Sequence, residues 1–223
     1  MAPGVERRLA AILAADVVGY SRLVEQDEAG TLSALKDLRR EVIDPLLAKH
    51  HGRIVKQMGD GAIAEFGSVV DAVACAVAVQ KGVAEQQVDV PPARRIVFRI
   101  GINLGDGVVE GEGLLGDGVN IAARLEQICE PGGVIISGTA YDQLQGKLAL
   151  PLEFVGEQRV KNIERPIRTY RITLNGKLTT RRSFGYLKRW APAAAMVLLA
   201  LGLLGDISRF LWSGSEPLGN KPA

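Results

Sequence analysis

The sequence predicts an α+β domain with a ferredoxin-like β-α-β-β-α-β core and extra carboxy-terminal strands, followed by a single transmembrane helix. An apolar run at residues 9–18 is typical of a central strand, and two strand-like segments joined by a tight turn follow at 52–66. Helix-like and strand-like segments then alternate to residue 174. The 223 residues, 47% of them hydrophobic, suffice for one globular domain of about 150–180 residues and an appendage.

The first expected strand contains one polar side chain, Asp16, between Leu9 and Val18. A continuous apolar run bounded by polar sequence indicates a strand buried on both faces. A carboxylate there is costly unless a cation meets it. Asp16 is therefore the first candidate functional residue.

Helical spacing over 27–50, with a break or kink at Pro45, predicts a helical segment, and a hairpin is expected over 52–58 and 62–66. Met58-Gly59-Asp60-Gly61 is typical of a hairpin tip. If this hairpin pairs beside the first strand, Asp60 and Asp16 converge on one point. Two converging carboxylates outline a divalent-metal site, and such metals usually serve phosphate chemistry or hydrolysis.

The second half of the domain continues the alternation, with Ser68 and Asp71 forming a capping box. We expect Asp117 to cap the helix that it precedes. The expected elements are a helix to about Glu85, strands at 96–104 and 108–110, a glycine-rich loop, a helix at 118–130, a strand at 133–137, a short helix, and a hairpin at 154–160 and 167–174.

Charge and cysteine content argue against a nucleic-acid-binding protein and against a site built from the two cysteines. A net charge of +2 with interleaved acids and bases does not indicate a nucleic-acid-binding protein. Cys75 and Cys129 are far apart, in no ligand-like spacing, and are expected to be reduced core thiols. The excess cations gather upstream of the last apolar segment, at Lys177, Arg181, Arg182, Lys188 and Arg189.

Residues 190–205 contain no charged or polar side chain, and tryptophans stand at 190 and 212. Spanning a bilayer takes about 20 residues, and the aromatic ends and upstream cations supply interfacial anchors. The sequence predicts a basic linker at 177–189, a transmembrane helix at 190–212 and a polar tail at 213–223. The domain at 1–176 would then be cytoplasmic, on a single-pass protein of the inner or plasma membrane. An amphipathic or buried helix is the alternative.

Three segments resemble the catalytic domains of class III nucleotidyl cyclases, which are the adenylate and guanylate cyclases. They are Ala10–Ser21, Ile54–Gly61 and Gly116–Leu125, and the resemblance extends over about 7–174. One such motif would be weak evidence, but three in the same order are specific.

The resemblance implies a head-to-tail homodimer with two sites, each built from both chains. Asp16 and Asp60, with the Val17 carbonyl, would hold two Mg²⁺ or Mn²⁺ ions. One ion would lower the pKa of the ribose 3′-hydroxyl for attack on the α-phosphorus, and the other would neutralise the triphosphate and departing pyrophosphate. The phosphates would lie against backbone N–H groups of Val17, Val18, Gly19, Tyr20 and Ser21.

The resemblance also implies that the partner chain supplies Asn120, which positions the ribose, and Arg124, which stabilises charge on the α-phosphoryl group. These residues are four apart and share a helix face. Lys56 would donate to adenine N1. Many relatives carry Asp, Thr or Ser seven residues before the asparagine to accept from the adenine 6-amino group, where this chain has Gly113; Glu112 or a backbone carbonyl could substitute.

The expected function is adenylate cyclase, which converts ATP to 3′,5′-cyclic AMP and pyrophosphate. Because Lys56 could equally donate to guanine O6, a guanylate or dual-specificity cyclase is the first alternative. Gly113 also leaves open a catalytically weak cyclase-like module for nucleotide binding or dimerisation. The four residues Asp16, Asp60, Asn120 and Arg124 favour the enzyme.

Overall fold

The computed structural model describes residues 7–110, 113–159, 163 and 165–174, which belong to one compact unit, Met1–Leu178. The strands are β1 (Arg7–Val17), β2 (Gly52–Met58), β3 (Gly61–Phe66), β4 (Phe98–Glu110), β5 (Gly113–Leu115), β6 (Val134–Ser137), β7 (Leu152–Gln158) and β8 (Ile167–Ile172). The helices are α1 (Tyr20–Gln26), α2 (Glu28–Leu38), α3 (Asp44–Lys49), α4 (Val69–Gln86), α5 (Asp117–Ile128) and α6 (Gly138–Leu144). A π-helical turn covers Arg39–Ile43, and a 3₁₀ turn covers Pro92–Arg94.

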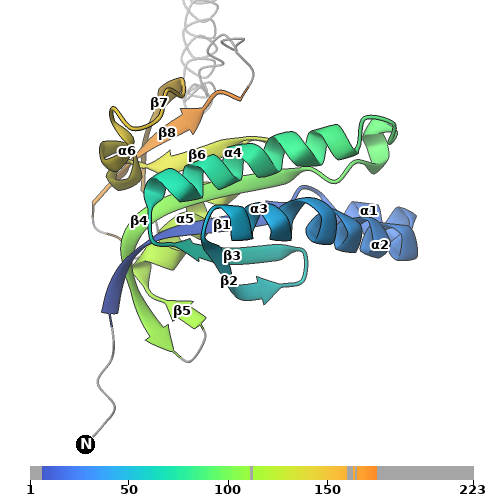
Figure 1. Cartoon of the computed structure of the whole chain (residues 1–223), viewed down its shortest axis with the longest axis horizontal. Helices are drawn as coiled ribbons and strands as arrows, with labels where there is room; N and C mark the ends of the chain where they lie inside the picture. The colour runs from blue at the N-terminus through green and yellow to red at the C-terminus, as the bar shows by residue number, and fades with distance from the viewer. Residues whose placement is uncertain (1–6, 111–112, 160–162, 164, 175–223) are drawn as a thin grey trace, which may run out of the picture. The chain divides into compact units, whose positions relative to one another are not determined.

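The strands form one mixed sheet in the order β2-β3-β1-β4-β6-β8-β7, with β5 paired to β4 (Figure 1). Within β2-β3-β1-β4, each strand runs antiparallel to its neighbours. This is the ferredoxin-like arrangement, so the predicted core is confirmed. Strand β6 then adds parallel to β4 through the crossover helix α5, and the β7–β8 hairpin extends the sheet as expected.

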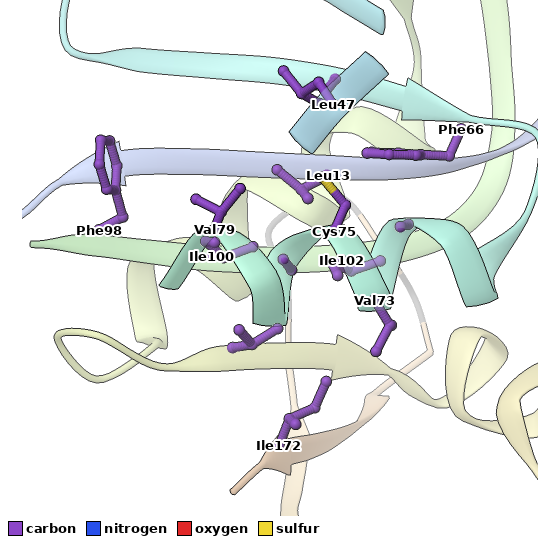
Figure 2. Close-up of a cluster of buried hydrophobic side chains, with 14 of the residues drawn as sticks. Leu13, Leu47, Phe66, Val73, Cys75, Val79, Phe98, Ile100, Ile102 and Ile172 are labelled. Carbon is purple, nitrogen blue, oxygen red and sulfur yellow. The ribbon is translucent and has the colours of Figure 1, made fainter. Parts of the chain in front are cut away.

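The two faces of the sheet pack against different helices. Because side chains alternate along a strand, Leu13 and Val17 of β1 enter the larger core, which α2, α3 and α4 cover. Figure 2 shows side chains of this core, which come from the sheet and from α3 and α4. Ile12 and Ala14 face the other way and pack under α5. Asp16 shares the parity of Ala14, so it lies on the α5 face.

Helix α5 lies very close to β4 at Gly101. A Cβ atom on Gly101 would lie 2.3 Å from the backbone nitrogen of Glu126 and 2.4 Å from the carbonyl oxygen of Ala122. No side chain fits at such distances, so glycine is what lets the helix backbone rest on the strand. This contact fixes the height of α5 above the sheet.

The separate strands predicted at 96–104 and 108–110 are wrong, because β4 is continuous from Phe98 to Glu110. Strand β4 pairs with the full length of β1, from Val17↔Phe98 to Arg7↔Val108. This continuous pairing keeps β4 extended at its glycines. Ile96 precedes β4 because its N–H and carbonyl bond instead to the side chain of Gln87. The expected glycine-rich loop also contains a strand, β5, which folds back on β4.

The helical segment predicted over 27–50, with a break or kink at Pro45, is divided into α2, a π-helical turn and α3. Asp27 caps α2, accepting a hydrogen bond from the N–H of Gly30, and a π-helical turn then leads into α3. Pro45 lies in the first turn of α3 and has no N–H to donate. The wider π turn lies just before Pro45 and is closed by a bond from the N–H of Asp44 to the carbonyl of Arg39.

The predicted capping role of Asp117 is also wrong. Gly116 occupies the N-cap position with φ 123°, and Asp117 is the first residue of α5. Within the described residues, no helix combines the length and apolar character needed to cross a bilayer. The predicted linker (177–189), transmembrane helix (190–212) and tail (213–223) lie outside the described residues.

Candidate active site

The β2–β3 hairpin brings Asp60 to Asp16. Met58 pairs with Gly61, which leaves a two-residue loop with Gly59 at φ 60°, as a type II′ turn requires at its first position. Strand β3 pairs with the end of β1, so Gly61 lies beside Asp16. A Cβ on Gly61 would lie 3.1 Å from Asp16 Oδ1. The absence of a side chain there leaves room for the two acids to meet.

The pKa of Asp16 is affected by the neighbouring carboxyl of Asp60. Burial raises the pKa of the Asp16 carboxyl, and the charge of Asp60, whose carboxyl is within hydrogen-bonding reach, raises it further. The N–H of Val17 and the guanidinium of Arg99 lower the same pKa. Two carboxylates at this separation repel each other, so the pair is a poor anion site and a favourable cation site.

The donor set fits Mg²⁺ or Mn²⁺. These cations prefer oxygen ligands, and Mg²⁺ commonly takes only one or two carboxylates, with water and substrate phosphates completing its shell. Asp16 and Asp60 supply two carboxylates, and Val17, whose carbonyl was expected to assist, follows directly at the end of β1. In the part of the chain that the structure describes, no three or more His, Cys, Asp or Glu residues form a metal-binding group.

Two charged residues that the sequence did not single out lie beside this pair. Arg99 of β4 is directly opposite Asp16 in the β1–β4 ladder. Glu126 of α5 is only 8% exposed, and its pKa is raised to about 7 by burial and by Asp16, with Arg99 opposing. In the sequence, Glu126 follows Ala122 by four residues, and this spacing places both residues on the same side of a helix.

The turn after β1 supplies part of the predicted phosphate cradle. Gly19, at φ 66°, is the N-cap of α1, so the first-turn N–H groups, which include those of Tyr20 and Ser21, have no acceptor within the helix. The N–H of Val18 donates to the carbonyl of Val97 at 2.8 Å, so its predicted contact with a phosphate would compete with this bond. Gly19, Tyr20 and Ser21 lie three to five residues beyond Asp16, and Val17 follows Asp16 directly.

Asn120 and Arg124 are exposed on α5, and a single chain does not bring them to the acids. The guanidinium of Arg124 donates to Gln127 Oε1 at 2.6 Å. The opposite side of the helix is packed on the sheet and comprises Gly118, Ala122, Leu125 and Glu126. The two predicted residues therefore point away from the sheet that carries Asp16, toward whatever lies against this face.

The predicted base-contacting positions lie on separate hairpins. Lys56 is exposed on β2 and pairs with Ile63, whose side chain packs on the α5 side of the sheet. A β-bulge beside Lys56 turns Val55 to the same side. Lys56 thus shares a face with Asp16. Gly113 opposes Glu110 in the β4–β5 hairpin.

Comparison with known proteins shows the family to which the chain belongs. The family model of the adenylate and guanylate cyclase catalytic domain matches residues 6–174. "Putative adenylate cyclase 3" of Rhizobium meliloti (strain 1021) is 50% identical over 163 residues, which are 73% of this chain and 28% of that protein. The chain therefore spans little more than a quarter of that relative.

Solved structures extend the similarity. An adenylate/guanylate cyclase/hydrolase from Silicibacter pomeroyi is 46% identical, with a TM-score of 0.72, over 76% of this chain and 98% of that chain. The adenylyl cyclase CyaB from P. aeruginosa is 25% identical, with a TM-score of 0.67, over 82% of this chain and all of that chain. The chain belongs to the adenylate and guanylate cyclase catalytic domain family.

Proposed function

We propose that this chain is an adenylate cyclase that works as a homodimer. The ribose 3′-oxygen of ATP attacks the α-phosphorus, the bond to the β,γ-diphosphate breaks, and the hydroxyl proton leaves to solvent. The observation that carries the proposal is the division of the site within one chain. Asp16 and Asp60 converge on the α5 side of the sheet, whereas Asn120 and Arg124 point outward from α5.

The acid pair provides the cation end of the site. Mg²⁺ or Mn²⁺, when bound, would acidify the attacking hydroxyl and neutralise the triphosphate. Asp16 and Asp60 would hold the ions; Asp16 lies in β1, and Asp60 lies in a two-residue turn closed by the pairing of Met58 with Gly61. The first-turn N–H groups of α1, from Tyr20 and Ser21, would orient the phosphates.

A second copy would supply the other half. Asn120 and Arg124 are one helical turn apart, so both can reach a single nucleotide lying against α5. Asn120 would orient the ribose. The Arg124 guanidinium would stabilise charge that develops on the α-phosphoryl oxygens, a contribution that depends on its fixed planar fork. Releasing Gln127 is the only rearrangement that the described contacts of Arg124 demand.

The choice of ATP rests on Lys56 and on similarity to a relative named as an adenylate cyclase. Lys56 would donate to adenine N1. Gly113 brings no side-chain acceptor for the 6-amino group, and this favours a guanylate or dual-specificity cyclase as the second candidate.

We further infer that residues 190–212 anchor the protein in the inner membrane, with the cyclase domain in the cytoplasm. Equal sedimentation of the full chain and of residues 1–178 with membranes would contradict the anchor.

The test is product formation by the purified full chain with Mn²⁺ and either ATP or GTP. We expect cyclic AMP from ATP, and none from Asp60→Ala. Asp89→Ala, which removes an exposed loop carboxylate, is the matched control and should be fully active. Cyclic GMP as the main product would support the second candidate. Neither product, under conditions where the dimer forms, would leave a nucleotide-binding or dimerisation module.

A further inference from the structure

Glu126 is a buried acid that the proposed mechanism does not use. Its place is set by the close contact at Gly101, where the helix backbone at Glu126 rests directly on β4. Gly101 pairs with Ala14 and Arg99 pairs with Asp16, so both β4 residues face α5. The fold therefore brings the Glu126 turn of α5 to the part of the sheet that ends in Asp16.

The charges in this region do not balance. The charges of Asp16 and Asp60 raise the pKa of the Glu126 carboxyl, and the guanidinium of Arg99 lowers the pKa of both Asp16 and Glu126. Among the described residues Glu126 forms no ion pair within 4.0 Å, and Arg99 Nε is buried without a hydrogen-bond partner. Three carboxylates face one guanidinium, so full ionisation leaves two negative charges. One bound divalent cation would balance these two charges.

We propose that Glu126 is a positioning residue of the cation site, a third carboxylate behind Asp16 whose charge strengthens divalent-cation binding without ligating the ion. This inference rests on the proposed function. We assign it no ligand role, since among the described residues no three acids form a metal-binding group. The acid acts instead through its charge in a buried setting, where water screens little.

The experiment is a Mn²⁺ titration of the full chain followed by electron paramagnetic resonance. It is run with 3′-deoxy-ATP, which lacks the attacking hydroxyl and cannot cyclise. In Glu126→Gln, which keeps the shape of the side chain, we expect Mn²⁺ to bind about tenfold more weakly. In the cyclase assay, the Mn²⁺ concentration for half-maximal rate should rise by a similar factor, with the rate at saturating Mn²⁺ and the KM for ATP unchanged.

Two further variants separate charge from structure. Glu130→Gln removes an exposed carboxylate four residues farther along and should bind Mn²⁺ like the wild type. Glu126→Asp keeps the charge and should bind Mn²⁺ more tightly than Glu126→Gln. If Glu126→Gln is folded and binds Mn²⁺ as the wild type does, or if Gln and Asp weaken binding equally, the inference is overturned.

The proposed function and the role of Glu126 can be refuted by different results. Wild-type protein that binds Mn²⁺ through Asp16, shown by loss of binding in Asp16→Asn, yet forms no cyclic nucleotide would refute the cyclase and still decide the role of Glu126. Wild-type protein that binds no Mn²⁺ would overturn both.

Discussion

At the scale of single residues, Gly113 stands where a side-chain acceptor would distinguish adenine from guanine. A site that hydrogen-bonds one substrate group rejects the analogue that lacks it, and one such bond is worth about 1–3 kcal/mol. In Gly113→Asp the new carboxylate would accept from the adenine 6-amino group and repel guanine O6. We expect the ratio of kcat/KM for ATP over GTP to rise about tenfold, which competition assays with both nucleotides would measure. An unchanged ratio would place base selection elsewhere.

Glu126 makes a second prediction, for the metal-free protein. Its folded pKa is raised to about 7 from an ordinary 4.5, so the folded state keeps a proton that the unfolded chain loses. The folded state therefore binds more protons in this window, and its stability falls as pH rises from about 4.5 to about 7, by up to about 3 kcal/mol. Urea unfolding in chelator at several pH values should show this loss in the wild type and a smaller one in Glu126→Gln. Parallel pH profiles would contradict it.

Sequence reasoning identified the site residues unevenly, and the reason is physical. Asp16 stood out because it is a charge in an apolar strand, and Asp60 stood out because it lies in a recognisable hairpin tip. Arg99 and Glu126 break no local rule, since a charged residue every few positions is the normal pattern of a strand or helix with one face in solvent. Only the strand register and the contact at Gly101 bring them to the acids.

At the scale of elements, the Gly101 contact predicts a specific sensitivity. In Gly101→Ala the new methyl group would overlap the backbone of α5, so the helix must shift, at a cost of about 1–3 kcal/mol in unfolding free energy. Gly67→Ala is the matched control, because its Cβ would meet nothing within 4 Å and its φ is not in the left-handed region. Urea denaturation measures both. Equal stability of the two variants would show that α5 tolerates displacement.

Element boundaries were predictable where local signals act alone. Strand β2 and the start of α4, with its Ser68 cap, follow their sequence patterns. Strand β4 does not, because its glycines signal breaks that pairing with β1 overrides. The π-helical turn, which lies just before Pro45, was equally hidden.

At the scale of the whole molecule, family and fold could be inferred from three ordered motifs, but the completeness of the site could not. A sequence does not show that Asn120 and Arg124 point away from the acids, because that follows from which side of α5 rests on the sheet. Each chain therefore presents the two acids on one surface and Asn120 and Arg124 on another, and a complete site needs one surface from each of two chains. Activity should then be a property of pairs of chains.

Mixing two inactive variants tests this directly. Asp60→Ala removes a cation-binding acid, and Arg124→Ala removes the guanidinium that the partner would supply. In a mixed dimer, one site carries both defects and the other carries neither, because each site takes Asp60 from one chain and Arg124 from the other. Random pairing of equal amounts should therefore restore about a quarter of wild-type activity.

The recovery should depend on subunit exchange. It should appear with the kinetics of exchange, followed by the rate of cyclic AMP formation after mixing, and covalently linked homodimers of each variant should show none. If each chain instead held a complete site, mixing would leave activity at the level of the separate variants at every ratio. The dependence of recovered activity on mixing ratio, greatest at equal amounts, therefore reports directly whether the face of α5 that bears Asn120 and Arg124 completes the site of a neighbouring chain.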